Sequence, residues 1–314
     1  MDICVWDKCN NRCQMCTNPD LPWKSKDGKV GEGYDYNVLI SRIERLKDKV
    51  EPDDAVILTG GEPTLHPHFL DVFNFTRKTF PEQELRILTN GRRFAYRDFA
   101  EEVMKADNLN IAVSLCGPTA EIHDKITRTK NSFIQAVQGL ENILSLKKEN
   151  QIVEIRTVLS KLSYRHIDQT LNLIQLRFPS IDRVIVIYLE TEGQAKKNLD
   201  KVLVPYSKLR PYLNRIEPFL PVFKELCLYH FPLCTLEPKF WPFVWRTLPA
   251  KEVVFIKSCE RCRYKKYCLG IHRDYPNKTA SGEFKPIKEE YAIEETDDFY
   301  HPITSFDIIR VEEK

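Results

Sequence analysis

Ten cysteines are the residues of this 314-residue chain with the clearest capacity for chemistry. Two tight groups of them stand near the two ends of the sequence. Because the N-terminus lacks a basic segment followed by an apolar one, we expect no secretory signal and therefore reduced thiols, which in clusters indicate metal or iron–sulfur ligands. We expect the outlying Cys4 and Cys116 to be buried as small apolar side chains. The ten are Cys4, Cys9, Cys13, Cys16, Cys116, Cys227, Cys234, Cys259, Cys262 and Cys268.

The first group, Cys9, Cys13 and Cys16, has the spacing C-x3-C-x2-C. Zinc sites usually take four ligands from two separated pairs, and no fourth Cys or His follows nearby. Three thiolates on one loop suit a [4Fe–4S] cluster whose fourth iron stays open to an outside ligand. An open position on iron indicates chemistry. A structural zinc site or chance spacing is the alternative.

The second group reads C-x2-C-x5-C at Cys259, Cys262 and Cys268, and Cys234 could supply a fourth thiolate. Cys227 could take the place of Cys234. Four thiolates would close one site completely, and the spacing allows either zinc or a second [4Fe–4S] cluster.

Six short apolar segments alternate with amphipathic, helix-like segments over the first 190 residues. Strands this apolar are typical of a parallel sheet covered on both faces. Right-handed crossovers can curl such a sheet into an incomplete barrel or leave it open, so the sequence predicts an α/β fold of one of these two kinds. The expected strands cover residues 2–6, 55–59, 86–89, 110–115, 152–160 and 183–189.

The character of the sequence changes after residue 200. Eight of the 19 prolines fall between residues 201 and 250, and helical periodicity weakens there. We therefore expect two domains, 1–200 and a smaller, irregular 201–314. The second has little apolar core of its own and should depend on its metal centre for stability.

The overall composition excludes several classes of protein. Hydrophobic residues make up 42% and charged residues 29%, which is ordinary for a globular protein. Lys and Arg number 47 and Asp and Glu 45, so a net charge of +2 gives no support for a nucleic-acid-binding surface. No apolar run approaches the ~18–20 residues of a membrane span. We expect a cytoplasmic protein.

Small and polar residues follow the carboxyl ends of the predicted strands, where α/β folds bind their ligands. The second strand runs into Gly60-Gly61-Glu62-Pro63, where glycines permit close backbone approach and the carboxylate of Glu62 could hold an ammonium group. In isolation this would be a plain turn. Asn90 and Ser114 follow the third and fourth strands. Arg156, inside the fifth strand, needs an anionic partner, either an internal carboxylate or one on a ligand.

The segment Cys9-Asn-Asn-Arg-Cys13-Gln-Met-Cys16, directly after the first strand, resembles the signature loop of the radical S-adenosylmethionine (SAM) superfamily. The resemblance implies a partial (β/α)6 barrel in which these three cysteines hold a [4Fe–4S] cluster chelated by SAM. Met15 stands where that family commonly has an aromatic residue against the adenine, and a thioether can also contact a ring face.

Other motifs extend the resemblance over about residues 1–190. Gly60-Gly61-Glu62-Pro63 is similar to the family's contact for the SAM amino group, and Asn90 and Ser114 match polar positions at the barrel mouth. Arg156 would then meet the SAM carboxylate. His123, Asp124 and Arg128 resemble an HD..R stretch in the molybdenum-cofactor cyclase and peptide-maturase branches, although Thr129 replaces the usual glycine. A helix cap with surface charge is the alternative for His123 and Asp124.

The C-terminal cysteines resemble the SPASM and twitch extensions that carry auxiliary [4Fe–4S] clusters. A full SPASM pattern continues with C-x3-C, whereas His272 occupies that position here. The resemblance therefore implies one auxiliary cluster on a twitch-like unit, with zinc as the alternative. The expected ligands are Cys234, Cys259, Cys262 and Cys268.

The activity implied by the resemblance is reductive cleavage of SAM to a 5′-deoxyadenosyl radical, which abstracts a hydrogen atom from a substrate. A flavodoxin- or ferredoxin-type reductant would supply the electron. Our first hypothesis is a maturase that oxidises or cross-links a peptide, although we expect no N-terminal peptide-recognition domain. The alternative is a small-molecule dehydrogenase or cyclase acting on an alcohol, sugar or nucleotide. A non-enzymatic metal sensor or electron carrier is disfavoured by the open three-cysteine site beside the GGEP motif.

Overall fold

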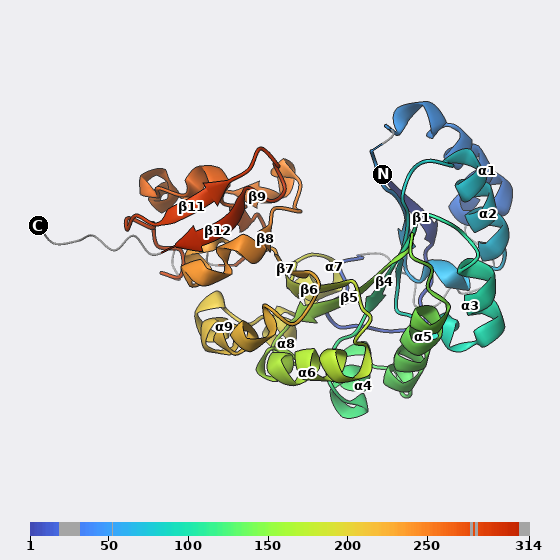
Figure 1. Ribbon diagram of the computed structural model, residues 1–314, viewed down its shortest axis with the longest axis horizontal. Helices are drawn as coiled ribbons and strands as arrows, with labels where there is room; N and C mark the ends of the chain where they lie inside the picture. Colours follow the sequence, from blue (N-terminus) through green and yellow to red (C-terminus); the bar gives the residue numbers. More distant parts are fainter. Residues whose placement is uncertain (19–31, 52, 277–278, 280–281, 308–314) are drawn as a thin grey trace, which may run out of the picture.

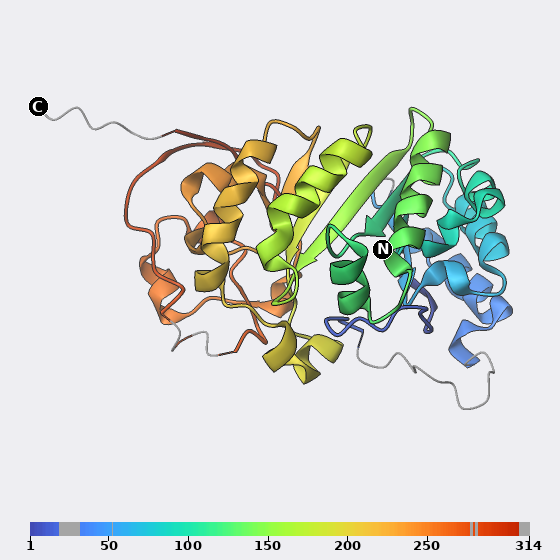
Figure 2. The same cartoon turned by 90° about the horizontal axis from the view of Figure 1, so that it is seen from below.

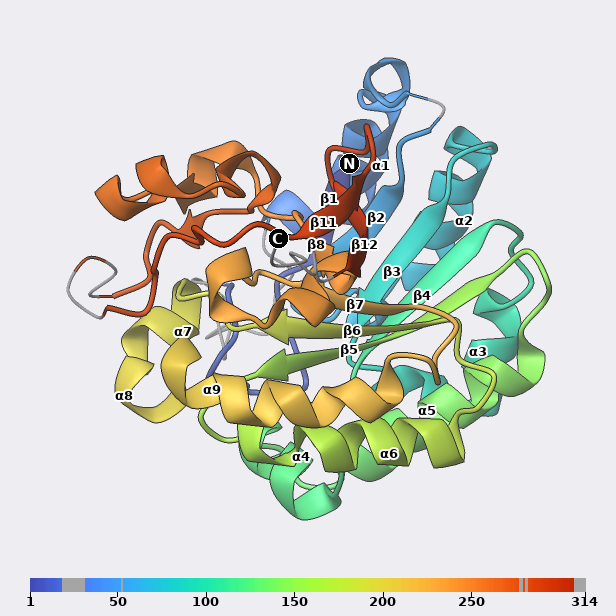
Figure 3. The same ribbon diagram turned by 60° about the vertical axis from the view of Figure 1, so that its left-hand side comes forward.

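A computed structural model describes residues 1–18, 32–51, 53–276, 279 and 282–307 of the chain. Within these residues one large sheet contains eight strands in sequential order, and every neighbouring pair is parallel. Figure 3 shows the strands fanning around a concave face. The strands are β1 (Asp2–Trp6), β2 (Val56–Gly60), β3 (Leu85–Thr89), β4 (Leu109–Ser114), β5 (Ile152–Leu159), β6 (Arg183–Tyr188), β7 (Leu226–Tyr229) and β8 (Val244–Trp245).

Helices cover the convex face of the sheet and connect its strands (Figure 2). The longest, α5, begins at Ser132 and ends at Leu146, and two short helices follow β6. This helix-on-one-face arrangement is that of an incomplete α/β barrel, as predicted. The helices are α1 (Tyr36–Glu44), α2 (Phe69–Thr79), α3 (Arg97–Val103), α4 (Ala120–Thr127), α5 (Ser132–Leu146), α6 (Ile167–Arg177), α7 (Gly193–Lys197), α8 (Leu199–Val202) and α9 (Tyr206–Leu213).

The alternation of side chains along the strands separates the two faces of the sheet. Ile87 and Val184, for example, are fully buried, whereas Arg86 and Arg183 on the same strands line a cavity on the concave face. The inner face is therefore partly polar, although the apolar strands had suggested cover on both faces. The other fully buried strand residues include Val56, Leu58, Val113, Val153, Ile155 and Val186.

The sheet continues beyond the six strands that the sequence pattern predicted. β7 pairs with β6, and β8 with β7, so residues after 200 add two strands to the barrel. Their pattern is weak because β7 has four residues and β8 only two, within the proline-rich stretch. The division into domains 1–200 and 201–314 stays a prediction.

The C-terminal part lies at the β8 end of the sheet, away from β1 and α1 (Figure 1). It contains two antiparallel pairs, β9 (Val253–Val254) with β10 (Ile271–His272), and β11 (Ala292–Glu295) with β12 (Ile303–Asp307). Short 3-10 helices carry much of the remaining chain. In the part of the chain that the structure describes, no helix has the length and apolar character needed to cross a membrane.

Candidate functional site

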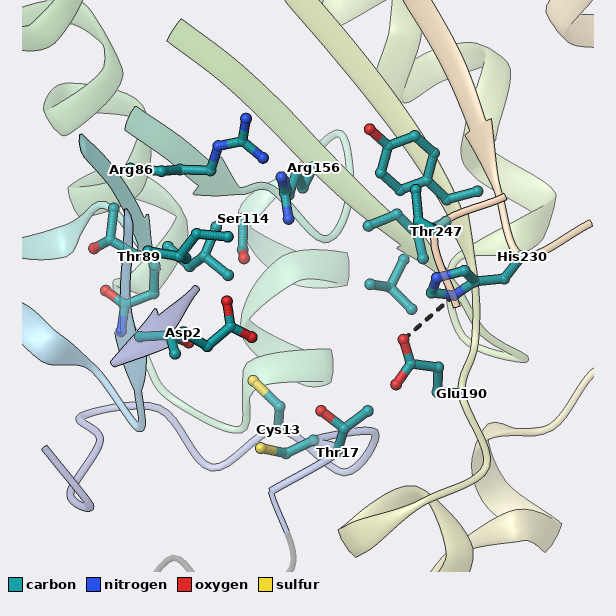
Figure 4. Close-up of a pocket in the computed structure, with 18 of the residues that line it drawn as sticks. Asp2, Cys13, Thr17, Arg86, Thr89, Ser114, Arg156, Glu190, His230 and Thr247 are labelled. Atoms are coloured by element: carbon teal, nitrogen blue, oxygen red, sulfur yellow. Dashed lines mark ion pairs between the residues drawn. The ribbon is translucent and has the colours of Figure 1, made fainter. Parts of the chain in front are cut away.

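A cavity of about 1010 Å³ occupies the concave face of the sheet (Figure 4). Its lining comes from the loop after β1 and from most strands of the barrel. Cys13 and Thr17 lie on one side of the cavity, and Glu190 and His230 lie on another side. Ser114 and Arg156 face the space between these two groups. The predicted site residues that line it are Cys9, Cys13, Met15, Cys16, Gly60, Gly61, Asn90, Ser114 and Arg156.

The loop that carries the first three cysteines is held against the end of β2. The amide of Gly61 donates to the carbonyl of Trp6 (2.7 Å), and the amide of Glu62 donates to that of Lys8 (2.8 Å). A Cβ atom on Gly61 would lie 2.3 Å from the Lys8 carbonyl oxygen. The glycine therefore permits this close approach, which places Cys9 at the cavity.

Two further elements fix the rest of the cysteine loop. The amide of Arg12 donates to the carbonyl of Thr127 at the end of α4 (2.8 Å). The amide of Gln194, in the first turn of α7, donates to the carbonyl of Cys16 (2.8 Å). Contacts far apart in sequence therefore set the shape of the loop, and no local spacing could have revealed them.

Glu62 is almost completely buried, with 1% of its surface exposed. Its carboxylate accepts hydrogen bonds from the hydroxyls of Thr64 (2.6 Å) and Thr89 (2.7 Å) and from the amide of Asn90 (2.7 Å). Burial raises the pKa of Glu62, while these donors oppose that rise. The geometry thus gives Glu62 a role in tying the end of β2 to the end of β3, and its contact with a SAM ammonium group stays a prediction.

The three thiols of the first group lie partly exposed in the cavity wall. Burial, followed by the charge of Glu62, raises the pKa of Cys9 to about 12. Burial also raises the pKa of Cys13, and Cys116 and Cys9 are the next contributors. Cys116, expected to be an apolar filler, is indeed buried, but it lies near Cys13 and also lines the cavity.

Arg156 finds its anionic partner inside the protein. Its guanidinium contacts the carboxylate of Glu154 at 2.9 Å, and Arg183 contacts the same carboxylate at 2.7 Å. The amide of Asn110 donates to it as well (2.9 Å). Burial alone would raise the pKa of Glu154, but the charges of Arg156, Arg86 and Arg183 and the Asn110 hydrogen bond outweigh it and lower the pKa to about 2. Arg156 therefore has an internal carboxylate partner, which was one of the two expected possibilities. Its contact with a SAM carboxylate stays a prediction.

The HD..R stretch lies mostly outside the cavity wall. His123 is buried in α4, where its Nδ1 accepts from the amide of Cys116 (3.1 Å). Asp124 accepts from the amides of Asn131 (2.7 Å) and Phe133 (2.8 Å) and so caps the start of α5. Arg128 is exposed at the end of α4 in a left-handed conformation, and it does not line the cavity. These contacts are structural. Pro63 is likewise buried outside the cavity lining.

The C-terminal cysteines surround a second, much smaller cavity. Cys234, Cys259, Cys262 and Cys268 all line it, together with apolar residues such as Phe284. Burial raises the pKa of Cys268 to about 11. Among the described residues, no group of three His, Cys, Asp or Glu side chains has an arrangement that could hold a single metal ion.

The two undecided residues of this region lie elsewhere. Cys227 is buried on β7, where its thiol contacts the carboxylate of Glu225 at 3.3 Å. His272 is buried beside Thr191 and Glu192, with its Nε2 3.6 Å from the Glu192 carboxylate. Neither lines the second cavity. The structure therefore groups Cys234, and not Cys227, with the later cysteines.

Sequence reasoning missed a carboxylate–imidazole pair in the large cavity. Glu190 follows β6 and His230 follows β7, and their side chains approach to 3.4 Å (Figure 4). Burial, followed by Glu192 and Glu252, raises the pKa of Glu190 to about 7, whereas burial lowers the pKa of His230 to about 4. Both residues directly follow strand ends, where functional residues of α/β folds are expected, but the sequence pattern did not predict β7.

A partial parallel α/β barrel with three thiols at the carboxyl edge of its strands places these candidate ligands where α/β barrels hold substrates and cofactors. The family model described as the radical SAM superfamily matches residues 3–174. The chain therefore belongs to the radical SAM superfamily, whose members use a [4Fe–4S] cluster and SAM.

Curated relatives include both cyclases and maturases. The chain is 30% identical over 177 residues to a GTP 3′,8-cyclase of Cronobacter sakazakii, which is 56% of this chain and 51% of that protein. It is 29% identical over 167 residues to a cysteine-type anaerobic sulfatase-maturating enzyme of Clostridium novyi, covering 51% of this chain and 43% of the relative. The matches thus span about half the length of these relatives.

Solved structures share the fold at low sequence identity. Streptococcus suis SuiB bound to its precursor peptide SuiA has a TM-score of 0.55 and 16% identity, covering 70% of this chain and 45% of SuiB. The enzyme anSMEcpe with bound AdoMet has a TM-score of 0.53 and 19% identity, covering 72% of this chain and 62% of that one.

Proposed function

We propose that this chain is a radical SAM maturase that oxidises or cross-links a peptide with the help of a second iron–sulfur cluster. The observation that carries the proposal is the separation of seven cysteines into two cavities. Three thiols open onto the large cavity of the barrel, and four surround a small cavity in the C-terminal part.

The donor sets are compatible with iron–sulfur clusters, with zinc as the alternative at the C-terminal site. Thiolates are soft ligands that suit iron–sulfur clusters as well as zinc. A zinc ion needs its ligands to converge at about 2.3 Å from one point, whereas a [4Fe–4S] cluster spreads its thiolates over several iron atoms. The four C-terminal thiols line one small cavity, which suits a centre bound by four thiolates, either a cluster or zinc.

Each site has a distinct part in the proposed reaction. Cys9, Cys13 and Cys16 would hold the cluster whose complex with SAM supplies a 5′-deoxyadenosyl radical for hydrogen abstraction. Met15, Gly60, Gly61, Asn90 and Ser114 line the same cavity and would position SAM. The residues that line this cavity would exclude water and orient the reacting groups, while the cofactors would supply the chemistry.

The peptide substrate is supported by relatives and fold neighbours. A maturating enzyme is among the curated relatives, and SuiB shares the fold in complex with a precursor peptide. The large cavity extends past β7 to Trp245 on β8 and to Tyr300, which belongs to the C-terminal part. A chain segment could therefore enter between the barrel and that part.

A second candidate is a small-molecule cyclase or dehydrogenase. The observation that favours it is the match to the GTP 3′,8-cyclase, which is as strong as the match to the maturase. Arg86 and Arg183 also line the large cavity and could face an anionic substrate. Each of them already contacts an internal carboxylate, at 2.6 Å and 2.7 Å, which weighs against this role.

Anaerobic reconstitution followed by iron counting and Mössbauer spectroscopy tests the cluster assignments. We expect about eight irons per chain, from two four-iron clusters. Addition of SAM and dithionite should then yield 5′-deoxyadenosine. About four irons would refute the second cluster, and absence of 5′-deoxyadenosine would refute the enzymatic proposal as a whole.

The substrate class can be tested with two sets of compounds. Short peptides encoded beside the gene and purine nucleoside triphosphates would each be incubated with the reconstituted enzyme, SAM and dithionite. A peptide that loses two hydrogens by mass spectrometry supports the maturase. Conversion of a nucleotide, with every peptide unchanged, supports the second candidate.

A further inference from the structure

Arg92 makes contacts that neither the family motifs nor the proposed reaction explain. It directly follows the Thr89-Asn90-Gly91 turn and begins the short 3-10 helix Arg92–Ala95. Its Nη1 donates to the carbonyl oxygen of Asn10 (2.5 Å) and to Oδ1 of Asn11 (2.9 Å). Both acceptors lie between Cys9 and Cys13, so the guanidinium holds the turn that separates these two thiols.

Neighbouring residues fix the guanidinium in this position. Its Nε donates to Oε1 of Gln135 on α5 (2.7 Å). Asn90 accepts from the Arg92 amide (3.1 Å), and its own side-chain amide donates to Oδ1 of Asn10 (2.7 Å). The planar, rigid fork of arginine can donate to Asn10, Asn11 and Gln135 at once, whereas a lysine ammonium is a single point charge.

The contacts also bring a positive charge to the cysteine loop. Burial lowers the pKa of Arg92, while the negative charges of Cys9, Glu62 and Asp124 oppose that effect. Net charge and hydrogen bonding near the sulfurs are the principal controls on the reduction potential of an iron–sulfur cluster. A fixed cation beside Cys9 would favour the reduced state, which carries one more negative charge.

We propose that Arg92 is a positioning residue of the first cysteine site, which holds the turn between Cys9 and Cys13 and raises the reduction potential of the cluster bound there. The inference rests on the proposed cluster at Cys9, Cys13 and Cys16. Outer contacts of this kind orient metal ligands and tune the bound group, and their loss usually weakens metal binding.

The test compares Arg92→Gln and Arg92→Lys with a matched control, Arg93→Gln. Arg93 is the next residue in the chain, but its guanidinium lies over the ring of Phe99 at 4.5 Å and donates to the Thr64 carbonyl. The control therefore removes an equal charge without touching the cysteine loop. All three variants would be reconstituted anaerobically, beside the parent protein.

Two measurements separate the effect of Arg92 on the cysteine loop from its effect on the reduction potential of the cluster. The first is the rate at which a chelator removes iron from the first site, which we expect Arg92→Gln to increase about 10–100-fold. The second is a redox titration of that cluster followed by electron paramagnetic resonance. Here Arg92→Gln should make reduction of the cluster about tenfold less favourable, which corresponds to a fall in the reduction potential of about 59 mV for one electron. Arg92→Lys should restore the potential but not the slow iron release.

The outcomes distinguish this inference from the proposed function. If Arg92→Gln behaves like Arg93→Gln in both measurements, or if Arg92→Lys fails to restore the potential, the inference is wrong. Equal loss of the C-terminal cluster would indicate general unfolding and would also overturn it. If Cys13→Ala with Cys16→Ala removes no iron from the parent, the proposed function fails first.

Discussion

The two cysteine sites are built in different ways. The first is a loop whose backbone is bound by the ends of β2, α4 and α7, all parts of one large sheet and its helices. The second lies among short 3-10 helices and two-residue strands. Cys259 lies within the 3-10 helix Lys257–Arg261, and Cys262 directly follows it. A site held by a preformed scaffold can leave a position open for chemistry, whereas a site in an irregular region must contribute to holding that region together.

The cavities around the two groups of thiols also differ in size and polarity. The first three thiols open onto a cavity of about 1010 Å³ that also contains Ser114, Arg156 and the Glu190–His230 pair. The four C-terminal thiols line a small cavity whose other residues are largely apolar, such as Phe255 and Ile271. The difference favours substrate chemistry at the first site and a closed, structural or electron-accepting role at the second.

The largest expected effect comes from removing ligands of the first site. Cys13→Ala with Cys16→Ala should abolish 5′-deoxyadenosine formation and remove about half of the iron, because a cluster cannot bind through Cys9 alone. Liquid chromatography and iron analysis measure both. Since neighbouring elements hold the loop independently, the thermal stability of the barrel should change little, and a collapse of the barrel would break the comparison.

The same double substitution in the second site should have the opposite profile. Cys262→Ala with Cys268→Ala should unfold the C-terminal part, because metal binding supplies folding free energy to a region with little regular structure. Limited proteolysis should then cleave after about residue 250, while SAM cleavage without substrate continues. Protection equal to that of the parent would show that apolar contacts of this part, such as that between the rings of Trp241 and Tyr264, suffice without the metal.

A third prediction concerns the barrel alone. Glu154→Gln removes the carboxylate that Arg156 and Arg183 share, while Arg183 keeps its contact with Glu225 at 2.7 Å. Breaking a buried ion pair typically costs about 3–5 kcal/mol. Chemical denaturation would measure the loss. Because the pKa of Glu154 is lowered to about 2, its contribution to stability is present above the ordinary glutamate range and disappears as the pH falls toward 2.

The pH dependence supplies the control for that prediction. Between about pH 5 and about pH 2, the parent should lose stability relative to Glu154→Gln, because the unfolded chain takes up a proton on this carboxylate before the folded chain does. Parallel curves for the two proteins would contradict the assignment. The iron content of the C-terminal site should be equal in both.

The smallest expected effect distinguishes the two candidates for the fourth C-terminal ligand. Cys227→Ala should keep the full iron content and cost only about 1 kcal/mol, since it removes one small buried side chain and its contact with Glu225. Cys234→Ala should instead lose most of the C-terminal iron. Iron loss in the first variant with retention in the second would reverse the assignment.

The strands were predictable because each is a short apolar run between polar loops. The expected 183–189, for example, corresponds to β6 at Arg183–Tyr188. β7 and β8 could not be predicted because four residues and two residues carry too little pattern. Glu190 and His230 were missed for the same reason, since their pairing depends on the contact between β6 and β7.

The amino-acid sequence by itself determined the α/β class, the membership in the radical SAM superfamily and the candidate thiols, because hydrophobic period and cysteine spacing are local properties. The tertiary structure alone decided the partners of those residues. It paired Arg156 with Glu154, placed Arg128 outside the cavity, separated Cys227 from Cys234 and set Arg92 against the cysteine loop. These outcomes depend on which distant strands and helices meet, and short-range sequence patterns do not encode such contacts.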